Sequence, residues 1–169
     1  MYGIPVSSHD MSSGVERDSE SSEPTGDEPV RVSLFDAVGG AAFFEAAVDH
    51  FYDAVLRDDV LRPLYPEDLA DARRHTALFL IQYWGGPGTY SEERGHPRLR
   101  MRHLPFAIGQ AERDAWFALM MGGIDASLAD APAGSLLDHP TEGSAIKASA
   151  RSMFFDYFEQ ASTAMINQH

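Results

Sequence analysis

The sequence predicts an all-α fold in which several helices pack compactly against one another. Apolar residues recur at helical spacing in successive segments between residues 34 and 166. Stretches rich in glycine and proline, such as residues 39–40 and 85–88, separate these segments and are typical of helix ends. No segment shows the apolar and polar alternation of a strand, and no internal repeat is evident.

The length and composition predict one domain that functions without membrane insertion. The chain has 169 residues, 44% of them hydrophobic, which suffices for one domain with a core. No apolar run reaches the roughly 18 to 20 residues that span a bilayer, and no signal-peptide pattern begins the chain, so we expect a cytoplasmic location. The net charge of -13 disfavours nucleic-acid partners, because phosphate binding needs clustered positive charge.

The absence of cysteine restricts the possible chemistry. It excludes disulfides, thiol catalysis, thiolate zinc sites and iron–sulfur clusters, so any metal must be held by His, Tyr or carboxylate side chains. A zinc site is also disfavoured, because His96 and His103 lie seven positions apart and no second pair of ligands accompanies them. The signatures of P-loop, dinucleotide-binding and serine hydrolase sites are missing.

Residues 1–31 differ from the rest of the chain. They are rich in Ser, Glu, Asp, Gly and Pro and lack apolar periodicity, which predicts a disordered acidic tail. Docking to a partner is the alternative interpretation of this tail. The folded domain is expected to cover residues 32–169.

Helix boundaries follow from capping residues and breakers. Ser33 can cap the first helix through its side chain. Pro66 ends a short turn around residues 60–64, since proline disfavours a helical conformation in the residue before it. A loop containing Tyr90 is expected before the proline at position 97. The expected helices cover residues 34–38, 41–57, 66–84, 97–103, 110–129 and a last segment containing residues 146–166.

A group of arginines lies close to His103. Arg94, Arg98, Arg100 and Arg102 all fall within nine positions of it, in a chain that is otherwise acidic. Cations around one potential metal ligand suit a cofactor that brings its own metal and carboxylates, and haem is the obvious candidate. The simpler interpretation also stands: a surface or core histidine beside a solvated basic face.

The neighbouring residues extend the haem hypothesis. Apolar walls for a macrocycle could come from Leu99 and Phe106. Three polar aromatic residues, Tyr52, Tyr65 and Trp116, either are core aromatics with satisfied polar tips or converge as a cage of hydrogen-bond donors over a metal.

Several short motifs occur in order at spacings that resemble those of a known family. The chain resembles the truncated haemoglobins of group II, specifically the O-type, actinobacterial branch, over about residues 33–167. The motifs that carry the resemblance are LFDAVGG at 34–40, FY at 51–52, LYPED at 64–68, QYWGGP at 82–87, GHPRLRMRH at 95–103 and RDAW at 113–116.

The resemblance implies a truncated globin with a two-over-two helical sandwich around haem b. It implies that His103 is the proximal iron ligand and that Tyr52, Tyr65 and Trp116 stabilise a ligand on the distal side. Thr76 stands where this branch commonly has Leu, which predicts a more open or wetter distal pocket. The remaining residues expected to contact the cofactor are Ala72, His75, Thr76, Phe79, Tyr90, Leu99, Arg100, Arg102 and Phe106.

The resemblance also implies a function with two open alternatives. Ferrous iron is expected to bind O2, NO or CO, with slow release through the Tyr/Trp cage. Slow release suits oxidative chemistry on NO or peroxide, such as NO dioxygenase or peroxidase-like activity, which needs an external reductase or electron donor. The alternatives are a sensor or carrier of O2 or sulfide that acts through a partner, and a helical interaction module without haem. Members of the family often form homodimers.

Overall fold

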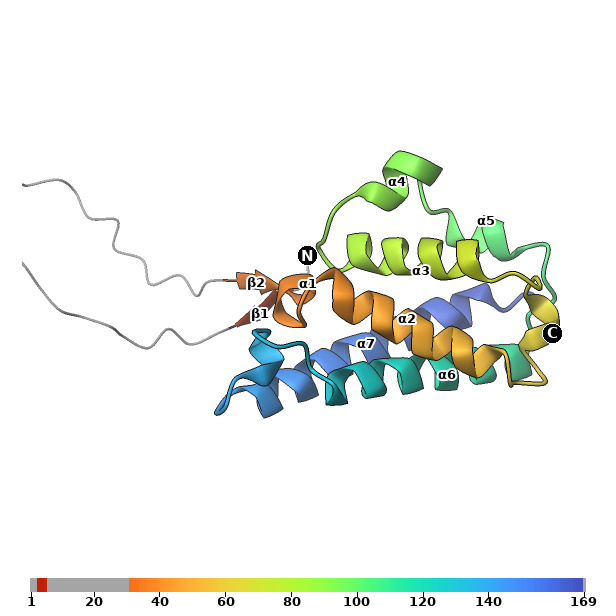
Figure 1. The fold of residues 1–169 in the computed structure, drawn as a ribbon. Helices are drawn as coiled ribbons and strands as arrows, with labels where there is room; N and C mark the ends of the chain where they lie inside the picture. Colours follow the sequence, from red (N-terminus) through yellow and green to blue (C-terminus); the bar gives the residue numbers. More distant parts are fainter. Residues whose placement is uncertain (1–2, 6–30, 169) are drawn as a thin grey trace, which may run out of the picture.

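The fold is mostly helical, as predicted (Figure 1). The structure is a computed structural model that describes residues 3–5 and 31–168. Most of the predicted acidic tail, residues 1–2 and 6–30, lies outside the described residues. The helices are α1 (Leu34–Ala37), α2 (Ala41–Val55), α3 (Ala70–Tyr83), α4 (Thr89–Arg94), α5 (Leu99–His103), α6 (Gln110–Ala129) and α7 (Gly143–Met165), with 3-10 turns at η1 (Arg62–Leu64) and η2 (Leu136–Asp138).

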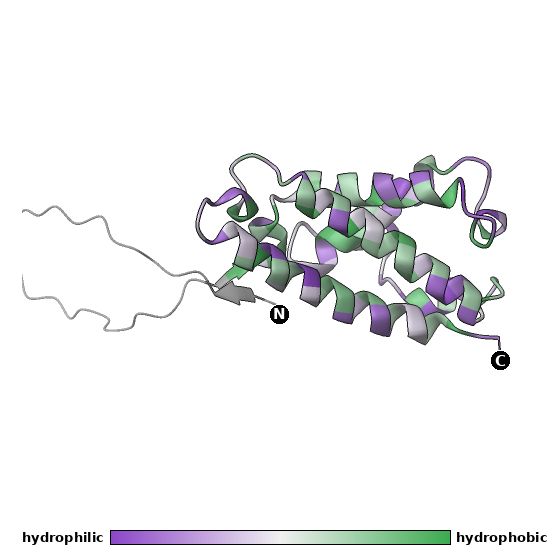
Figure 2. Cartoon of the chain, turned by 90° about the horizontal axis from the view of Figure 1, so that it is seen from below, coloured by the Kyte–Doolittle hydropathy of each residue, from purple (hydrophilic) through white to green (hydrophobic). Residues whose placement is uncertain are grey.

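The long helices α2, α3, α6 and α7 pack in two levels. Helix α2 contacts both α3 and α6, and α6 also contacts α7. In the view of Figure 1, α6 and α7 lie below α3, and α2 crosses between them. Hydrophobic and hydrophilic residues alternate along each long helix (Figure 2), as expected for helices that bury one side.

Aromatic side chains fill much of the core between these helices. Phe43 and Phe44 of α2 are fully buried and pack against Phe154 of α7, with ring centroids 5.7 Å and 6.0 Å from it. Phe158 continues the same stripe one turn later in α7. Buried aromatic pairs of this kind contribute about 0.5 to 1.5 kcal/mol beyond their area burial, so they hold α2 against α7.

A small sheet precedes α1 and was not predicted. Strand β1 (Gly3–Pro5) pairs antiparallel with β2 (Arg31–Ser33), with Ile4 opposite Val32. Strands of three residues show no usable alternation, which explains why the sequence did not predict them. Ser33, which ends β2, caps α1 as predicted: its side chain accepts a hydrogen bond from the Asp36 N–H at 3.1 Å.

Other helix boundaries differ from the prediction. Helix α3 begins at Ala70 rather than at residue 66. The Asp68 carboxylate accepts a hydrogen bond from the Ala70 N–H at 2.9 Å, which satisfies one of the N–H groups that have no partner within the helix. Helix α5 begins at Leu99 rather than at residue 97, after Arg98 in a left-handed conformation with φ 43°. Helix α6 has the predicted bounds.

The segment around Tyr90, expected to be a loop, forms α4. Two contacts hold this short helix against α3. The Gln82 side chain bonds both the backbone and the hydroxyl of Ser91, and Arg74 forms a two-point ion pair with Glu93. In the part of the chain that the structure describes, no helix is long and apolar enough to cross a membrane.

Candidate functional site

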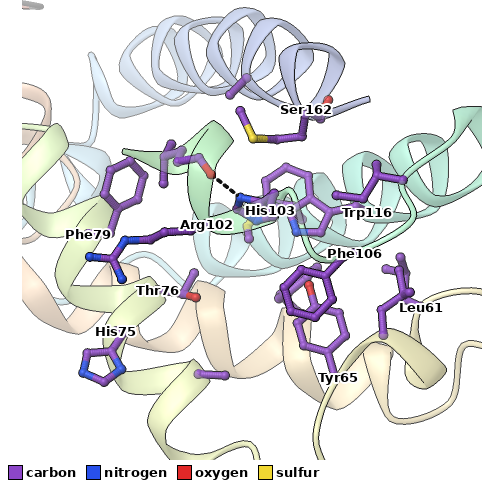
Figure 3. Close-up of a pocket in the computed structure, with 18 of the residues that line it drawn as sticks. Leu61, Tyr65, His75, Thr76, Phe79, Arg102, His103, Phe106, Trp116 and Ser162 are labelled. Atoms are coloured by element: carbon purple, nitrogen blue, oxygen red, sulfur yellow. Dashed lines mark hydrogen bonds between the residues drawn. The ribbon is translucent and has the colours of Figure 1, made fainter. Parts of the chain in front are cut away.

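A cavity of about 420 Å3 lies where α2, α3, α5, α6 and α7 meet (Figure 3). Volumes of this size are typical of sites for small molecules and cofactors. The cavity is lined by every residue that the sequence analysis assigned to the site, with the exception of Arg100.

His103 lies in the last turn of α5 and is half-buried. Its ring Nδ1 lies 2.7 Å from the carbonyl oxygen of Leu99, four residues earlier (Figure 3). A carbonyl oxygen can only accept, so Nδ1 carries the proton and donates it. The lone pair of Nε2 is therefore free, which is the arrangement found in histidines that bind metal through Nε2.

Tyr52 and Thr76 form a hydroxyl pair at the cavity wall. Tyr52 comes from α2 and is 3% exposed, Thr76 comes from α3, and their hydroxyl oxygens are 3.0 Å apart. Burial raises the pKa of Tyr52 above its usual range, although the bond to Thr76 and the charge of Arg73 oppose this. Whichever hydroxyl donates to the other, the pair retains one further O–H that can donate into the cavity.

Tyr65 and Trp116 form a second pair. Tyr65 follows η1 and Trp116 lies in α6, and Figure 3 shows both side chains at the cavity. Burial raises the pKa of Tyr65 strongly, the neighbouring Tyr52 raises it further, and the hydrogen bond with Trp116 lowers it. The indole N–H can only donate, so the Tyr65 hydroxyl accepts from it and keeps its own proton for another partner.

The two pairs belong to one aromatic cluster. The rings of Tyr52 and Tyr65 are perpendicular, with centroids 5.6 Å apart, and Phe51 lies 5.7 Å from Trp116. These ring contacts restrict the rotamers of the side chains on the sides that do not face the cavity. The hydroxyl groups therefore have a preferred orientation before any ligand enters.

Basic side chains lie at another part of the cavity lining. His75 and Arg94 are neighbours, with 3.4 Å between the His75 Nδ1 and a guanidinium nitrogen. Arg102 donates to the backbone carbonyls of Pro97 and Arg94, at 2.8 Å and 3.0 Å. Neither arginine has a carboxylate partner within 4 Å among the described residues, so both remain available to an anionic group.

Apolar residues form the remaining walls. Phe79 of α3 packs edge-on against Tyr90 of α4, with centroids 5.5 Å apart, and Tyr90 is buried. Ala72 lies one turn before Thr76 on the same helix, and its small side chain leaves room there. Leu99 and Phe106 contribute from α5 and the segment after it.

The structure separates Arg100 from the other predicted residues. Its guanidinium donates to the carbonyl oxygen of Ala164 near the end of α7, at 3.3 Å, and it does not line the cavity. An alternation of arginines through a short helix places some of them toward the cavity and others away from it, which the sequence spacing alone did not resolve.

Several lining residues were missed by the sequence analysis. They include Arg113 of α6 and Tyr157, Ser162 and Met165 of α7. Tyr157 and Met165 stand at the helical spacing of the other apolar residues of α7, and this spacing is typical of core residues, so it does not distinguish them as part of a site.

The described residues contain no group of three or more His, Asp or Glu side chains that could hold a metal ion. One directed histidine in an apolar cavity with basic groups at its lining instead fits a metal carried by a macrocycle with acidic substituents. The donor set is therefore consistent with haem.

Comparisons with known proteins identify the family. Residues 33–142 match the family model described as bacterial-like globin. The fold aligns with the hemoglobin of the thermophilic phototrophic bacterium Chloroflexus aurantiacus, at 43% identity and a TM-score of 0.68, over 81% of this chain and 99% of that one. The thermostable hemoglobin of Thermobifida fusca aligns at 42% identity and a TM-score of 0.68, over 80% and 98%.

Curated sequences give the same assignment. The group 2 truncated hemoglobin YjbI of Bacillus subtilis is 44% identical over 86 residues, which are 51% of this chain and 65% of that protein. Two-on-two hemoglobin-3 of Arabidopsis thaliana is 30% identical over 57% of this chain and 56% of its own length. The alignments thus span less than two thirds of these curated relatives. The chain belongs to the bacterial-like globin family, as a truncated haemoglobin of group II, and this membership implies a haem-iron cofactor that binds small gas ligands such as O2.

Proposed function

We propose that this chain holds haem b through His103 and binds O2, NO or CO with slow release, as a step in oxidative chemistry. The observation that carries the proposal is the content of one cavity: a histidine with its Nε2 left free, the Tyr52–Thr76 hydroxyl pair and the Tyr65–Trp116 pair, each of which keeps one O–H to donate. When bound, haem supplies a redox-active iron that accepts these diatomic ligands.

His103 serves as the proximal ligand in this proposal. The hydrogen bond to Leu99 fixes the ring orientation and increases the basicity of Nε2, as second partners of metal-bound histidines do. Arg94 and Arg102 take the propionates, because neither guanidinium has a carboxylate partner within 4 Å in the described part of the chain, and His75 lies beside Arg94 as a further polar contact. Leu99, Phe79 and Phe106 cover the faces of the macrocycle.

Tyr52, Tyr65 and Trp116 stabilise the ligand in this proposal, and Thr76 shares the hydroxyl proton of Tyr52. A hydroxyl that donates to an acceptor with negative charge contributes about 1.5 to 3 kcal/mol. Since about 1.4 kcal/mol corresponds to a tenfold change, two such bonds slow ligand escape by roughly a hundredfold or more. Both phenols are protonated at neutral pH and can donate, since the ordinary tyrosine pKa of 10.0 already ensures this and burial raises the pKa of both groups further.

Slow release favours turnover over transport. A protein that retains O2 delivers it poorly, but the bound O2 stays long enough to react with NO. A peroxidase-like reaction, with peroxide as the reactant, is the other oxidative activity in this proposal. Such turnover consumes electrons, and an external reductase or electron donor supplies them in this proposal. A sensor or carrier of O2 or sulfide is the alternative, and it needs a partner but no sustained electron supply.

The first experiment is the absorption spectrum of the purified chain in the ferric state, after reduction, and after exposure to O2 and to CO. A Soret band that shifts with each ligand at one haem per chain supports the proposal, and a pyridine haemochrome spectrum identifies haem b. Failure to take up haem after reconstitution contradicts it. Sustained NO or peroxide consumption with a reducing system then separates an enzyme from a sensor or carrier. The cytoplasmic location and a homodimer stay predictions, and size-exclusion chromatography tests the second.

A further inference from the structure

The residues that follow α7 contact the segment that follows His103. Asn167 lies between the carbonyl groups of the α5–α6 connection: its side-chain Nδ2 donates to Phe106 at 2.9 Å and to His103 itself at 3.4 Å. Its Oδ1 accepts the N–H of Ile108 at 3.0 Å. One half-buried amide side chain thus satisfies three backbone groups of a connection that forms few hydrogen bonds of its own.

Backbone contacts continue the same junction. The N–H groups of Asn167 and Gln168 both donate to the Ile108 carbonyl, at 2.9 Å and 3.1 Å. Near the start of α5, Arg100 donates to the Ala164 carbonyl at 3.3 Å. We call Ala164, Asn167 and Gln168 the C-terminal clasp. The clasp therefore contacts α5 near both of its ends.

Helix α5 needs such external support. It has five residues, so few intrahelical hydrogen bonds hold it, and isolated helices of this length do not persist in water. Met101 within α5 and Leu104 directly after it are 61% and 60% exposed, so little apolar burial stabilises the helix from the outer side. The position of His103 therefore depends on hydrogen bonds to its own carbonyl group and to the backbone groups of the segment that follows it.

We propose that Asn167 is a positioning residue for His103. Its hydrogen bonds to the carbonyl groups of His103 and Phe106 fix the backbone at the end of α5, and this sets how far the histidine ring extends into the cavity and how it is tilted. This inference rests on the proposed role of His103 and adds a residue that lies outside the cavity lining. An asparagine suits the task because its amide donates and accepts at once, which neither a carboxylate nor an aliphatic side chain does.

The test compares Asn167→Ala and Asn167→Asp with two controls in the full-length protein as purified. Gln168→Ala is the matched neighbour, because the contact of Gln168 runs through its backbone N–H and its side chain is exposed. Ile146→Val, in α7 and outside the cavity lining, loses a methylene from the core and controls for a general loss of stability.

Two readouts are needed. Amide hydrogen exchange at Ile108 reports the junction directly: Asn167→Ala is expected to speed it by roughly tenfold, whereas Gln168→Ala leaves it unchanged. The iron–histidine stretching band of the ferrous protein reports the ring. We expect it to move in Asn167→Ala, and at least as far in Asn167→Asp, which places a carboxylate against two carbonyl oxygens. Haem transfer to an acceptor globin is expected to be roughly tenfold faster in both.

The outcomes separate this inference from the proposed function. Unchanged exchange at Ile108 in Asn167→Ala overturns the clasp. Faster exchange with an unmoved iron–histidine band shows that Asn167 ties the chain locally without positioning His103, which also overturns the inference. If the iron–histidine band moves equally in Ile146→Val, the shift reflects a general loss of stability, and this outcome also overturns the inference. A wild-type protein without a Soret band contradicts the proposed function, and exchange at Ile108 still decides whether the clasp exists.

Discussion

The ring Nδ1 of His103 lies 2.7 Å from the carbonyl oxygen of Leu99, one helical turn earlier. Because the carbonyl can only accept, this contact selects the tautomer in which Nε2 has a free lone pair. A short helix therefore presents one basic nitrogen in a defined orientation. His96, seven residues earlier, is exposed, and its Nδ1 instead accepts the Arg98 N–H at 3.3 Å.

His103→Ala is expected to abolish stoichiometric haem retention, because no other histidine in the described cavity offers a comparably directed nitrogen. Haem content per chain, measured by the pyridine haemochrome method, checks this. His96→Ala is the control and is expected to keep one haem per chain. Purification of His103→Ala with one haem per chain would remove His103 as the iron ligand.

Tyr65→Phe is expected to raise the O2 dissociation rate by roughly tenfold to a hundredfold while haem stays bound, because it removes one O–H donor to a charged acceptor. The Trp116 indole N–H also loses its acceptor in this variant. Stopped-flow displacement of O2 by CO measures the rate. Tyr83→Phe, in α3 but outside the cavity lining, is the control. An unchanged rate in Tyr65→Phe contradicts the donor cage.

Replacement of Thr76, the partner of Tyr52, by leucine is expected to lower the O2 dissociation rate, whereas Tyr65→Phe raises it. Thr76→Leu removes the hydroxyl that shares the Tyr52 O–H and adds bulk to the cavity wall. We expect O2 release to slow by roughly twofold to tenfold, since the Tyr52 hydroxyl then donates to the ligand alone. We also expect less water ligation in the ferric spectrum. Thr76→Ser keeps the hydroxyl and should behave like the wild type. If neither the O2 dissociation rate nor the ferric spectrum changes in Thr76→Leu, the prediction that Thr76 makes the pocket more open or wetter is wrong.

The helices could be predicted from the sequence wherever apolar periodicity extended over several turns. Helix α6 has the predicted bounds, and α2 begins at the predicted residue and ends two residues before the predicted end. Helix α4 was missed because Tyr90 is its one buried residue, and its stability comes from the contacts of Gln82 and Arg74 across the chain. Such contacts between distant residues leave no periodic signal.

The residues of the candidate site could also be predicted only in part. The sequence motifs identified His103, Tyr52, Tyr65 and Trp116, and the structure brings all four to one cavity. The sequence could not indicate that Arg100 turns toward α7, because α5 is too short to define its faces by periodicity. The contact of Asn167 with His103 could not be predicted either, since a single amide side chain just after α7 shows no pattern that indicates a partner 64 residues earlier in the chain.

The raised pKa values of Tyr52 and Tyr65 predict a loss of stability in alkali. Both folded values lie above the ordinary value of 10.0. Above about pH 10 the unfolded chain releases phenolic protons that the folded chain retains, so the free energy of unfolding falls as the pH rises, and the contribution is fully present below that pH. Urea unfolding between about pH 8 and about pH 11 measures the slope. Tyr65→Phe is expected to flatten it, and equal slopes in both proteins would contradict the burial argument.

Alanine substitutions at two adjacent glycines of α6, Gly122 and Gly123, are expected to change the free energy of unfolding in opposite directions. A Cβ on Gly123 would lie 2.5 Å from the Ala47 carbonyl oxygen, whereas one on Gly122 meets nothing within 4 Å. Gly123 thus permits the close crossing of α2 and α6 that keeps Phe51 beside Trp116. Gly123→Ala is expected to cost about 1 to 3 kcal/mol through overpacking.

Gly122→Ala is the matched control, and it is expected to stabilise the protein by about 0.5 to 1 kcal/mol because alanine favours the helix. Urea unfolding of both variants measures the difference. Because the Gly123 substitution forces α2 away from α6, we also expect it to disturb the Tyr65 and Trp116 contact and to raise the O2 dissociation rate, which Gly122→Ala should not do. Equal stabilities for the two variants would show that the α2–α6 crossing is less close than the structure has it.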